Sequence, residues 1–79
     1  MFDSGGIMND IAIITQLLIF TGLSQSEFAT AIGVDRSNIT KWKNGFQKMS
    51  FKNKYRCLMT FEDNKRVKEF LKPIVKGMV

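Results

Sequence analysis

Residues 25–44, which read QSEFATAIGVDRSNITKWKN, decide the fold. Apolar residues recur at helical spacing on both sides of Gly33, so this stretch predicts two short helices joined by a tight turn, as in a helix-turn-helix. Ala29 is small enough for the second helix to cross close above it, and Gly33 can adopt the positive φ of such a turn. The residues expected to seal the angle between the helices are Phe28, Ala29, Ile32, Gly33, Val34, Ile39 and Trp42.

Capping residues mark the ends of these two helices. Ser24 and Glu27 have the spacing of a capping box, in which each side chain accepts a hydrogen bond from the backbone N–H of the other residue. Asp35 can cap the second helix, which would begin at Arg36, and Gly45 can end it. The two helices are therefore expected over residues 25–32 and 36–44.

The rest of the chain predicts three more helices. The first is expected over residues 9–21, with a core face formed by Ile11, Ile14, Leu17 and Leu18. Another follows Ser50, with an apolar face formed by Phe51, Tyr55, Leu58 and Met59. The last begins near residue 63 or 64, should kink or end at Pro73, and carries the stripe Val67, Phe70, Leu71 and Ile74. The expected fold class is all-α, a single compact domain of four to five helices over residues 9–79 behind a flexible tail of residues 1–8.

Size and composition exclude several kinds of protein. The chain has 79 residues, one cysteine, no histidine and a formal net charge of +5. This length fits one domain, which would be only marginally stable alone. An intrachain disulfide, a zinc finger and nucleophile pairs that depend on histidine are all excluded. We therefore expect no enzyme, no metal and no other cofactor, and we interpret Cys57 as a small core residue.

Charge is distributed unevenly along the chain. Residues 1–35 contain four acidic residues and no Lys or Arg, whereas residues 36–79 contain all twelve basic residues and three acidic ones. The two parts therefore carry net charges of −4 and +9. Such asymmetry suggests that the second part meets a polyanion, although charge alone is equally compatible with a solvated basic face.

The second helix of the pair is expected to lie in the major groove of double-stranded DNA, with its first residues at base edges. Arg36 can form a bidentate pair with guanine O6 and N7, and Ser37 and Thr40 can hydrogen-bond to several bases. Lys41 lies one turn after Ser37 on the same exposed face. These four residues are the predicted base readers. For Asp35, a capping role is favoured over a contact with cytosine.

Contacts with the DNA backbone are expected around this helix. Gln25 opens the preceding helix, where side chains and backbone amides can meet a phosphate. Lys43, Asn44 and Lys48 flank the far end of the reading helix and are predicted to follow the backbone. For Lys52, Lys54 and Arg56, phosphate contacts and a solvated face are equally compatible with the sequence.

The stretch TAIGVDRSNITKWK at residues 30–43 resembles the phage lambda CII-type transcriptional activator family. The resemblance extends over about residues 21–75, through the turn, Trp42 and Lys43, an aromatic-containing connector, and the acidic pair at residues 62 and 63. More loosely, the chain is similar to Cro and CI-type helix-turn-helix phage regulators, which implies a lambda-repressor-like fold. The CII resemblance implies a homotetramer joined through its last helix, which binds direct repeats beside a −35 region and contacts RNA polymerase.

Self-association is also expected from the sequence itself. One helix-turn-helix reads only a few base pairs, so specific binding normally needs two copies, and a dimer or tetramer is the expected assembly. The helix over residues 64–79 is predicted to provide the contact, through Phe70, Leu71, Ile74 and Val75. The first helix is apolar nearly all round and offers a second surface. In the alternative, the five short helices simply cover both surfaces.

The sequence thus predicts a sequence-specific, DNA-binding transcriptional regulator of phage or prophage type, with roles in lysogeny implied by the resemblance. A Cro-like repressor, and a protein-interaction module of antirepressor or antitoxin type on the same fold, stay open as alternatives. The apolar run of residues 7–20 is interrupted by polar residues and is shorter than the roughly 20 residues of a membrane span. We therefore expect a cytoplasmic protein without a membrane partner.

Overall fold

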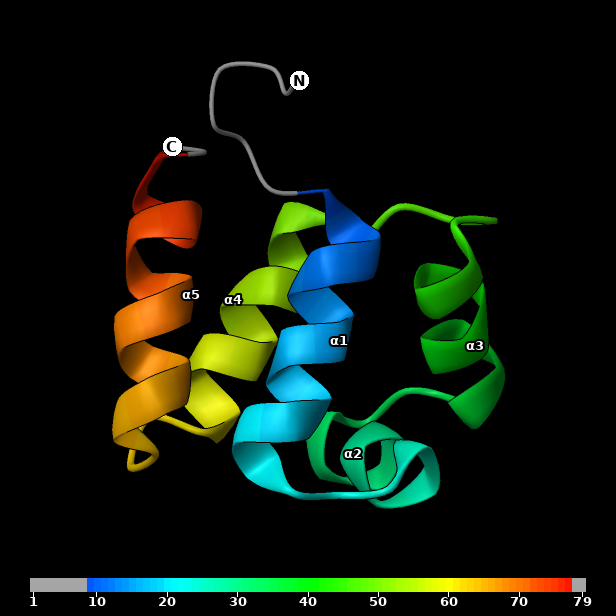
Figure 1. The fold of residues 1–79 in the computed structure, drawn as a ribbon, viewed down its shortest axis with the longest axis horizontal. Coiled ribbons are helices and arrows are strands. Elements are labelled where there is room, and N and C mark those ends of the chain that lie inside the picture. The colour runs from blue at the N-terminus through cyan, green and yellow to red at the C-terminus, as the bar shows by residue number, and fades with distance from the viewer. Residues whose placement is uncertain (1–8, 78–79) are drawn as a thin grey trace.

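The computed structural model describes residues 9–77, so the tail expected at residues 1–8 lies outside the described residues. Within this part, the chain forms five helices and no strand: α1 (Asp10–Thr21), α2 (Gln25–Ile32), α3 (Arg36–Asn44), α4 (Phe51–Thr60) and α5 (Lys65–Gly77). Figure 1 shows α1 in the middle of the molecule, with α3 and α5 on opposite sides of it. The expected all-α fold class is confirmed.

Side-chain caps begin four of the five helices among residues 9–77. The Asn9 side chain accepts a hydrogen bond from the backbone N of Ala12 at 2.9 Å. The capping box at α2 is complete, since Ser24 Oγ accepts from the Glu27 N at 3.1 Å and the Glu27 carboxylate accepts from the Ser24 N at 2.9 Å. Ser50 caps α4 in the same way as Asn9 caps α1.

Helix α5 has a cap that also fastens it to α1. The Oδ1 of Asn64 accepts a hydrogen bond from the Val67 N at 3.1 Å, and its Nδ2 donates to the carbonyl oxygen of Phe20 at 3.2 Å. Phe20 also packs edge to face against Phe70, with 5.5 Å between the ring centroids. The start of α5 is therefore held against the end of α1.

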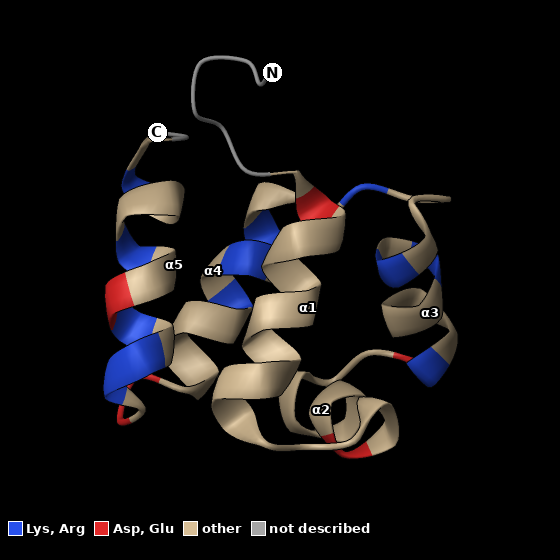
Figure 2. Cartoon of the chain, in the orientation of Figure 1, with Lys and Arg blue, Asp and Glu red and all other residues tan. Residues whose placement is uncertain are grey.

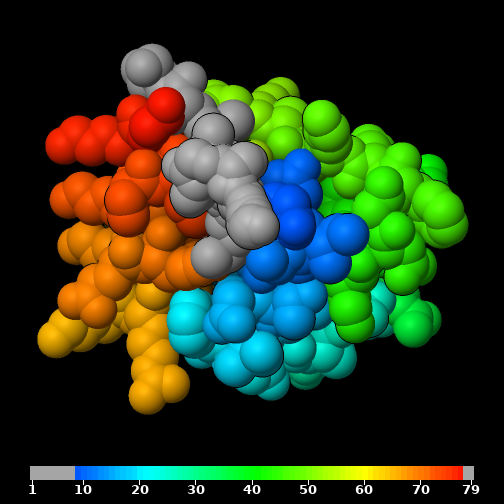
Figure 3. Space-filling model, turned by 45° about the horizontal axis from the view of Figure 1, so that its top comes forward, coloured from blue at the N-terminus to red at the C-terminus, as the bar shows by residue number. Residues whose placement is uncertain are grey.

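The core draws on all five helices. Helix α1 packs against both α3 and α5, α2 packs against α3 and α4, and α4 packs against α5. The space-filling view shows the surface of α1 between that of α5 and that of the segment around α3 (Figure 3). The largest fully buried side chains are Trp42, Phe28, Ile13, Ile14, Leu17, Ile39, Leu71, Val67 and Cys57. An element packed on two sides explains why α1 is apolar nearly all round.

Two predicted core faces are wrong in detail. In α1, Ile13 is fully buried and Ile11 is largely exposed, because α1 turns Ile13, Ile14 and Leu17 inward between its two neighbours. In α4, the predicted apolar face lies outward: Phe51, Tyr55 and Met59 are 40%, 48% and 45% exposed. The residues of α4 that face the core are instead Lys54, Cys57 and, in part, Leu58.

Pro73 does not end the last helix. Helix α5 continues past it to Gly77. A proline inside a helix costs one backbone hydrogen bond and crowds the preceding turn. Burial of Val67, Leu71 and Val75, which lie at helical spacing on both sides of Pro73, offsets that cost.

Candidate nucleic-acid interface

The turn between α2 and α3 has the predicted geometry. Gly33 has a φ of +76°, in the left-handed region that favours glycine. The Val34 N donates to the Ala29 carbonyl oxygen at 3.0 Å, and the Gly33 N donates to that of Thr30 at 3.2 Å. These two bonds satisfy the last carbonyls of α2 while the chain reverses. They fix the direction in which α3 leaves the turn.

Helix α3 is anchored by one face, which leaves the other free. Ile39 and Trp42 are fully buried, and Ala29 and Ile32 of α2 are each only 2% exposed beneath them. The predicted helix-turn-helix core, including the partly buried Val34, therefore packs as the sequence indicates. Because Ile39 and Trp42 occupy the inner face, the opposite side of α3 is turned toward solvent, with exposed side chains at Arg36, Ser37, Thr40, Lys41 and Asn44.

All four predicted base readers lie on this free face. Arg36, Ser37, Thr40 and Lys41 are exposed, and their spacing of one, three and one residues keeps them on one side of the helix. The Oγ1 of Thr40 donates to Gln25 Oε1 at 3.3 Å and is also 3.4 Å from the Arg36 carbonyl oxygen. The first residue of α2 thus borders the exposed face of α3, and the structure brings Gln25 and Thr40 together.

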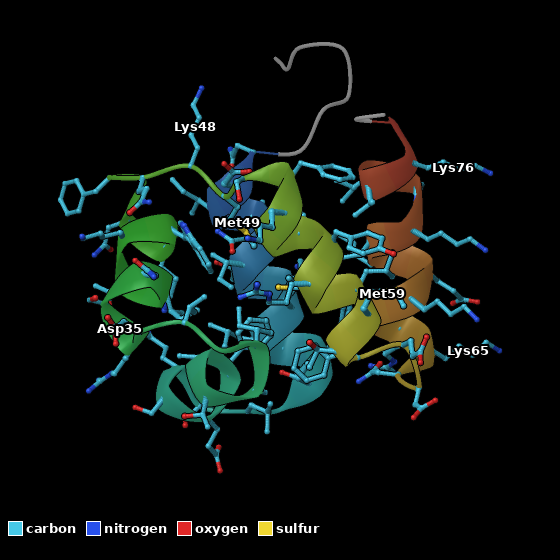
Figure 4. The ribbon with its side chains drawn as sticks, turned by 180° about the vertical axis from the view of Figure 1, so that it is seen from behind. Asp35, Lys48, Met49, Met59, Lys65 and Lys76 are labelled. Atoms are coloured by element: carbon cyan, nitrogen blue, oxygen red, sulfur yellow. The ribbon has the colours of Figure 1, made fainter. Side chains whose placement is uncertain are left out.

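The other predicted backbone residues surround the far end of α3. Asn44 is exposed one turn after Thr40, whereas Lys43 is partly buried. Lys48 lies in the loop between α3 and α4, and Figure 4 shows its side chain pointing away from the molecule. These residues are therefore within the same region as the predicted base readers, although they come from two segments.

Asp35 does not cap α3 as predicted. It occupies the capping position with an extended backbone, but its side chain makes no cap hydrogen bond. The backbone supplies a substitute, because the Asn38 N donates to the Asp35 carbonyl oxygen at 3.0 Å. Figure 4 shows Asp35 at the edge of the molecule, where its carboxylate is exposed.

The sequence left the roles of three basic residues of α4 undecided, and the structure assigns a role to two of them. Lys54 is buried, and its Nζ lies 3.0 Å from Asp10 Oδ1 in a salt bridge. Arg56 is partly buried, and its Nη1 donates to the Ile32 carbonyl oxygen at 3.4 Å, which braces the end of α2. Both residues therefore stabilise the packing of the helices behind the interface and do not form part of its exposed surface. Lys52 is exposed.

Two features of this region had no signal in the sequence. The second carboxylate oxygen of Asp10 accepts a hydrogen bond from the Met49 N at 2.9 Å, which ties the loop after α3 to the first turn of α1. Phe46, in the same loop, is 82% exposed beside the end of α3. A contact across 39 residues and a solvent-facing phenylalanine cannot be read from local periodicity.

Charge follows the same division as the sequence. Figure 2 shows basic residues on α3, α4 and α5, whereas the charged residues on α2 are acidic. The pKa of Glu27 is lowered, mainly by the hydrogen bond from the Ser24 backbone and to a smaller extent by one from the Ser24 hydroxyl, so the carboxylate of this cap stays ionised. Burial raises the pKa of the Cys57 thiol to about 12 against a smaller opposing effect of Arg56, so this residue is a protonated part of the core.

The predicted oligomerisation residues do not form an exposed surface. Leu71 and Val75 are buried, and Phe70 and Ile74 are partly buried against the core, because α5 turns its apolar stripe toward α1 and α4. The face that α5 leaves exposed carries Lys65, Lys68, Lys72 and Lys76. Helix α5 therefore covers the core of its own chain, as in the alternative that the sequence left open, and oligomerisation through these residues stays a prediction.

Helix α2, the glycine turn and α3 with its free polar face define a helix-turn-helix, the class of motif with which many regulators bind DNA. A helix-turn-helix family model matches residues 21–53, which cover α2, α3 and the loop up to the start of α4. Searches of curated proteins and of solved structures gave no match. The family match supports DNA binding and transcription regulation, and it lends no support to the narrower assignment to CII-type activators.

No single helix among residues 9–77 is both long and apolar enough to cross a membrane. Helices α1 and α2 meet that requirement only when taken together, and they are bent by 96° at the break between them.

Proposed function

We propose that this protein is a sequence-specific transcriptional regulator that inserts α3 into the major groove of double-stranded DNA. In this proposal Arg36, Ser37, Thr40 and Lys41 read base edges. Gln25, Lys43, Asn44 and Lys48 contact the backbone. The protein binds its site without a cofactor and performs no catalysis.

The observation that carries the proposal is the exposed polar face of α3 beside Gln25. A guanidinium at the first turn, two hydroxyls and an ammonium share that face, and none of them has an acidic partner among the described residues. The inner face of the same helix is fixed by Trp42 and Ile39. A rigid helix with exposed polar side chains on one side is what base recognition requires.

The test begins with selection of binding sites from random duplexes, followed by affinity measurements on the selected site. Arg36→Ala is expected to weaken binding by about 1–3 kcal/mol and to relax the preference at one position, because a bidentate contact to guanine is lost. Lys72→Ala is the matched control, since it removes the same charge from α5 at the other side of the molecule (Figure 2). Equal losses from both variants, with base preference unchanged, would contradict the reading role of α3.

Within this class, we propose a regulator of phage or prophage type that resembles the CII activators and contacts RNA polymerase. A Cro-like repressor is the alternative, and the same interface serves both, because the outcome depends on where the site lies relative to the promoter. A reporter with the selected site placed beside a −35 element distinguishes them. Increased transcription supports an activator, and occlusion alone supports a repressor.

One observation favours a protein-interaction module as a second candidate. Ile11 and Ile19 of α1 are 43% and 62% exposed, so the first helix leaves part of its apolar surface open to solvent. An antirepressor or antitoxin would use such a surface in place of DNA contacts. A gel shift with random DNA at low salt separates the two, because a module of this kind would bind no DNA.

A further inference from the structure

Helix α4 presents an apolar strip to solvent. Phe51, Tyr55 and Met59 are spaced four residues apart, so they follow one line along the helix. They are 40%, 48% and 45% exposed, and the rings of Phe51 and Tyr55 stack with 6.1 Å between their centroids. We refer to these three residues as the α4 strip. Three large side chains in one exposed line are more than scattered surface hydrophobes, and such a line is typical of a contact surface.

The far end of the strip, at Met59, lies away from the candidate DNA interface. The opposite side of α4, with Lys54 and Cys57, faces the core. Figure 4, which views the molecule from behind, shows Met59 on the side of α4 remote from α3. A partner on the strip would therefore leave the exposed face of α3 free.

The charges around the strip differ between its two ends. Lys52 lies at the end where α4 begins, and Glu62 and Asp63 follow directly after α4 ends. All three are exposed. If a second α4 ran antiparallel to the first, the acidic end of each helix would lie beside the basic end of the other. A parallel arrangement would instead set lysine against lysine.

We propose that the α4 strip is the contact between two copies of this chain, packed antiparallel about a two-fold axis near Tyr55. In this register Phe51 of one protomer meets Met59 of the partner subunit, since each lies four residues from Tyr55. The surface is thus complementary to itself in charge, as an isologous interface must be. The inference rests on the proposed function only in its consequence for DNA, namely that two copies of α3 would read an inverted repeat.

A strip of three side chains buries less area than the roughly 1,200–2,000 Å² of a stable interface. The dimer is therefore expected to be weak and concentration-dependent in free solution. Charge complementarity then contributes a large share of the specificity, and it can be reversed by substitution.

The first test uses the full chain without DNA, in sedimentation equilibrium at low salt. Lys52→Glu alone, and Glu62→Lys with Asp63→Lys, should each weaken dimerisation about tenfold or more, because like charges meet at both ends. An equal mixture of the two variants should restore the dimer, since every junction between unlike partners is again acid against base. The substituted residues are exposed, and circular dichroism checks that each variant is folded.

The second test places a thiol at the proposed axis. Tyr55→Cys should cross-link into a dimer under mild oxidation, because residue 55 lies opposite itself. Cys57 does not interfere, since it is fully buried. Thr60→Cys, exposed at the end of α4 off the strip, and Lys72→Cys, on the exposed face of α5, are the matched controls.

The outcomes separate this inference from the proposed function. A wild-type chain that stays monomeric up to millimolar concentration overturns the inference, as does a mixture that restores nothing. Preferential cross-linking through Lys72→Cys overturns it in favour of α5. None of these results concerns whether a single copy binds a half-site, which the Arg36→Ala comparison measures separately.

Discussion

Asp10 joins three segments through one carboxylate. One oxygen pairs with Lys54 Nζ at 3.0 Å in α4, and the other accepts a hydrogen bond from the Met49 N at 2.9 Å in the loop after α3. The side chains of Lys54 and Asp10 are only 10% and 15% exposed. A lysine in such a place is tolerated only if its charge is compensated. Asp10 therefore controls both the burial of α4 and the course of the loop that carries Lys48.

Removal of this carboxylate charge should be costly. Asp10→Asn is expected to lower the free energy of unfolding by about 3 kcal/mol, because the buried ammonium of Lys54 would lose the carboxylate charge that lies 3.0 Å from it. Lys54→Met in the same chain should recover part of the loss, since it removes the charge and fills the space. Urea denaturation of the two single variants and the double variant measures the coupling. Strictly additive effects would contradict the pairing.

Cys57 predicts a dependence of stability on alkaline pH. Burial raises the pKa of its thiol from the ordinary value of 9.0 to about 12 in the folded chain. The folded state therefore holds the proton more tightly, and this contribution is complete below pH 9. It should be lost as the pH rises toward 12, by about 1.4 kcal/mol per pH unit, because only the unfolded chain then ionises. Unfolding of the wild type and of Cys57→Ala, compared across that range, isolates the effect. Parallel curves would argue against it.

At the scale of elements, two turns depend on glycine for different reasons. Gly33 and Gly45 have nearly the same backbone, with φ of +76° and +78°. A Cβ added at Gly33 would only approach Arg56 at 3.9 Å, whereas at Gly45 it would meet the Cδ1 of Ile11 at 3.0 Å. The turn after α3 is thus constrained by a neighbour as well as by its own conformation.

This difference gives a prediction about matched substitutions. Gly33→Ala should cost about 1–2 kcal/mol of stability from the left-handed backbone alone. Gly45→Ala should cost more, because Ile11 must also move. The excess should disappear in an Ile11→Ala background, where the crowding atoms are gone. Thermal unfolding is measured for Gly33→Ala and Gly45→Ala, each with and without Ile11→Ala, and for Ile11→Ala alone. If Gly45→Ala still costs more than Gly33→Ala in the Ile11→Ala background, Ile11 is not the cause of the difference.

The sequence predicted the elements well where the signal was local. Capping at Ser24, the end of α2 at Gly33 and the inward side of α3 depend on residues within one or two turns of each other, so their pattern is visible in the chain itself. The four predicted base readers lie on one exposed face for the same reason, since Trp42 and Ile39 fix which side of α3 is inward.

Prediction failed where a distant partner decides the orientation of a helix. Periodicity in α4 favoured burial of the three residues of its apolar strip, but the salt bridge of Lys54 with Asp10 turns the opposite side inward. The apolar stripe of α5 was correctly located, and it packs against the core of its own chain. The spacing of apolar residues is the same whether a helix packs on the core of its own chain or against a second chain.

At the scale of the whole molecule, the charge asymmetry becomes a spatial one. The molecule measures 32 × 28 × 21 Å. Helices α3 and α5 lie at opposite ends of its longest axis, and Figure 4 shows Lys65 and Lys76 pointing outward on the side remote from α3. The basic residues of the second part of the chain therefore form two separate surfaces, of which only one belongs to the candidate DNA interface.

The central position of α1 sets the smallest unit in which recognition can be studied. The segment that resembles other helix-turn-helix proteins starts at residue 21, where α1 ends. Yet α3 rests on α1, and Asp10 at the start of α1 holds the loop behind the reading helix. A synthetic peptide of residues 21–53, or a graft of that segment onto another scaffold, would leave Trp42 and Ile39 without their support. The reading surface is thus a property of the intact globule and is not portable as a motif.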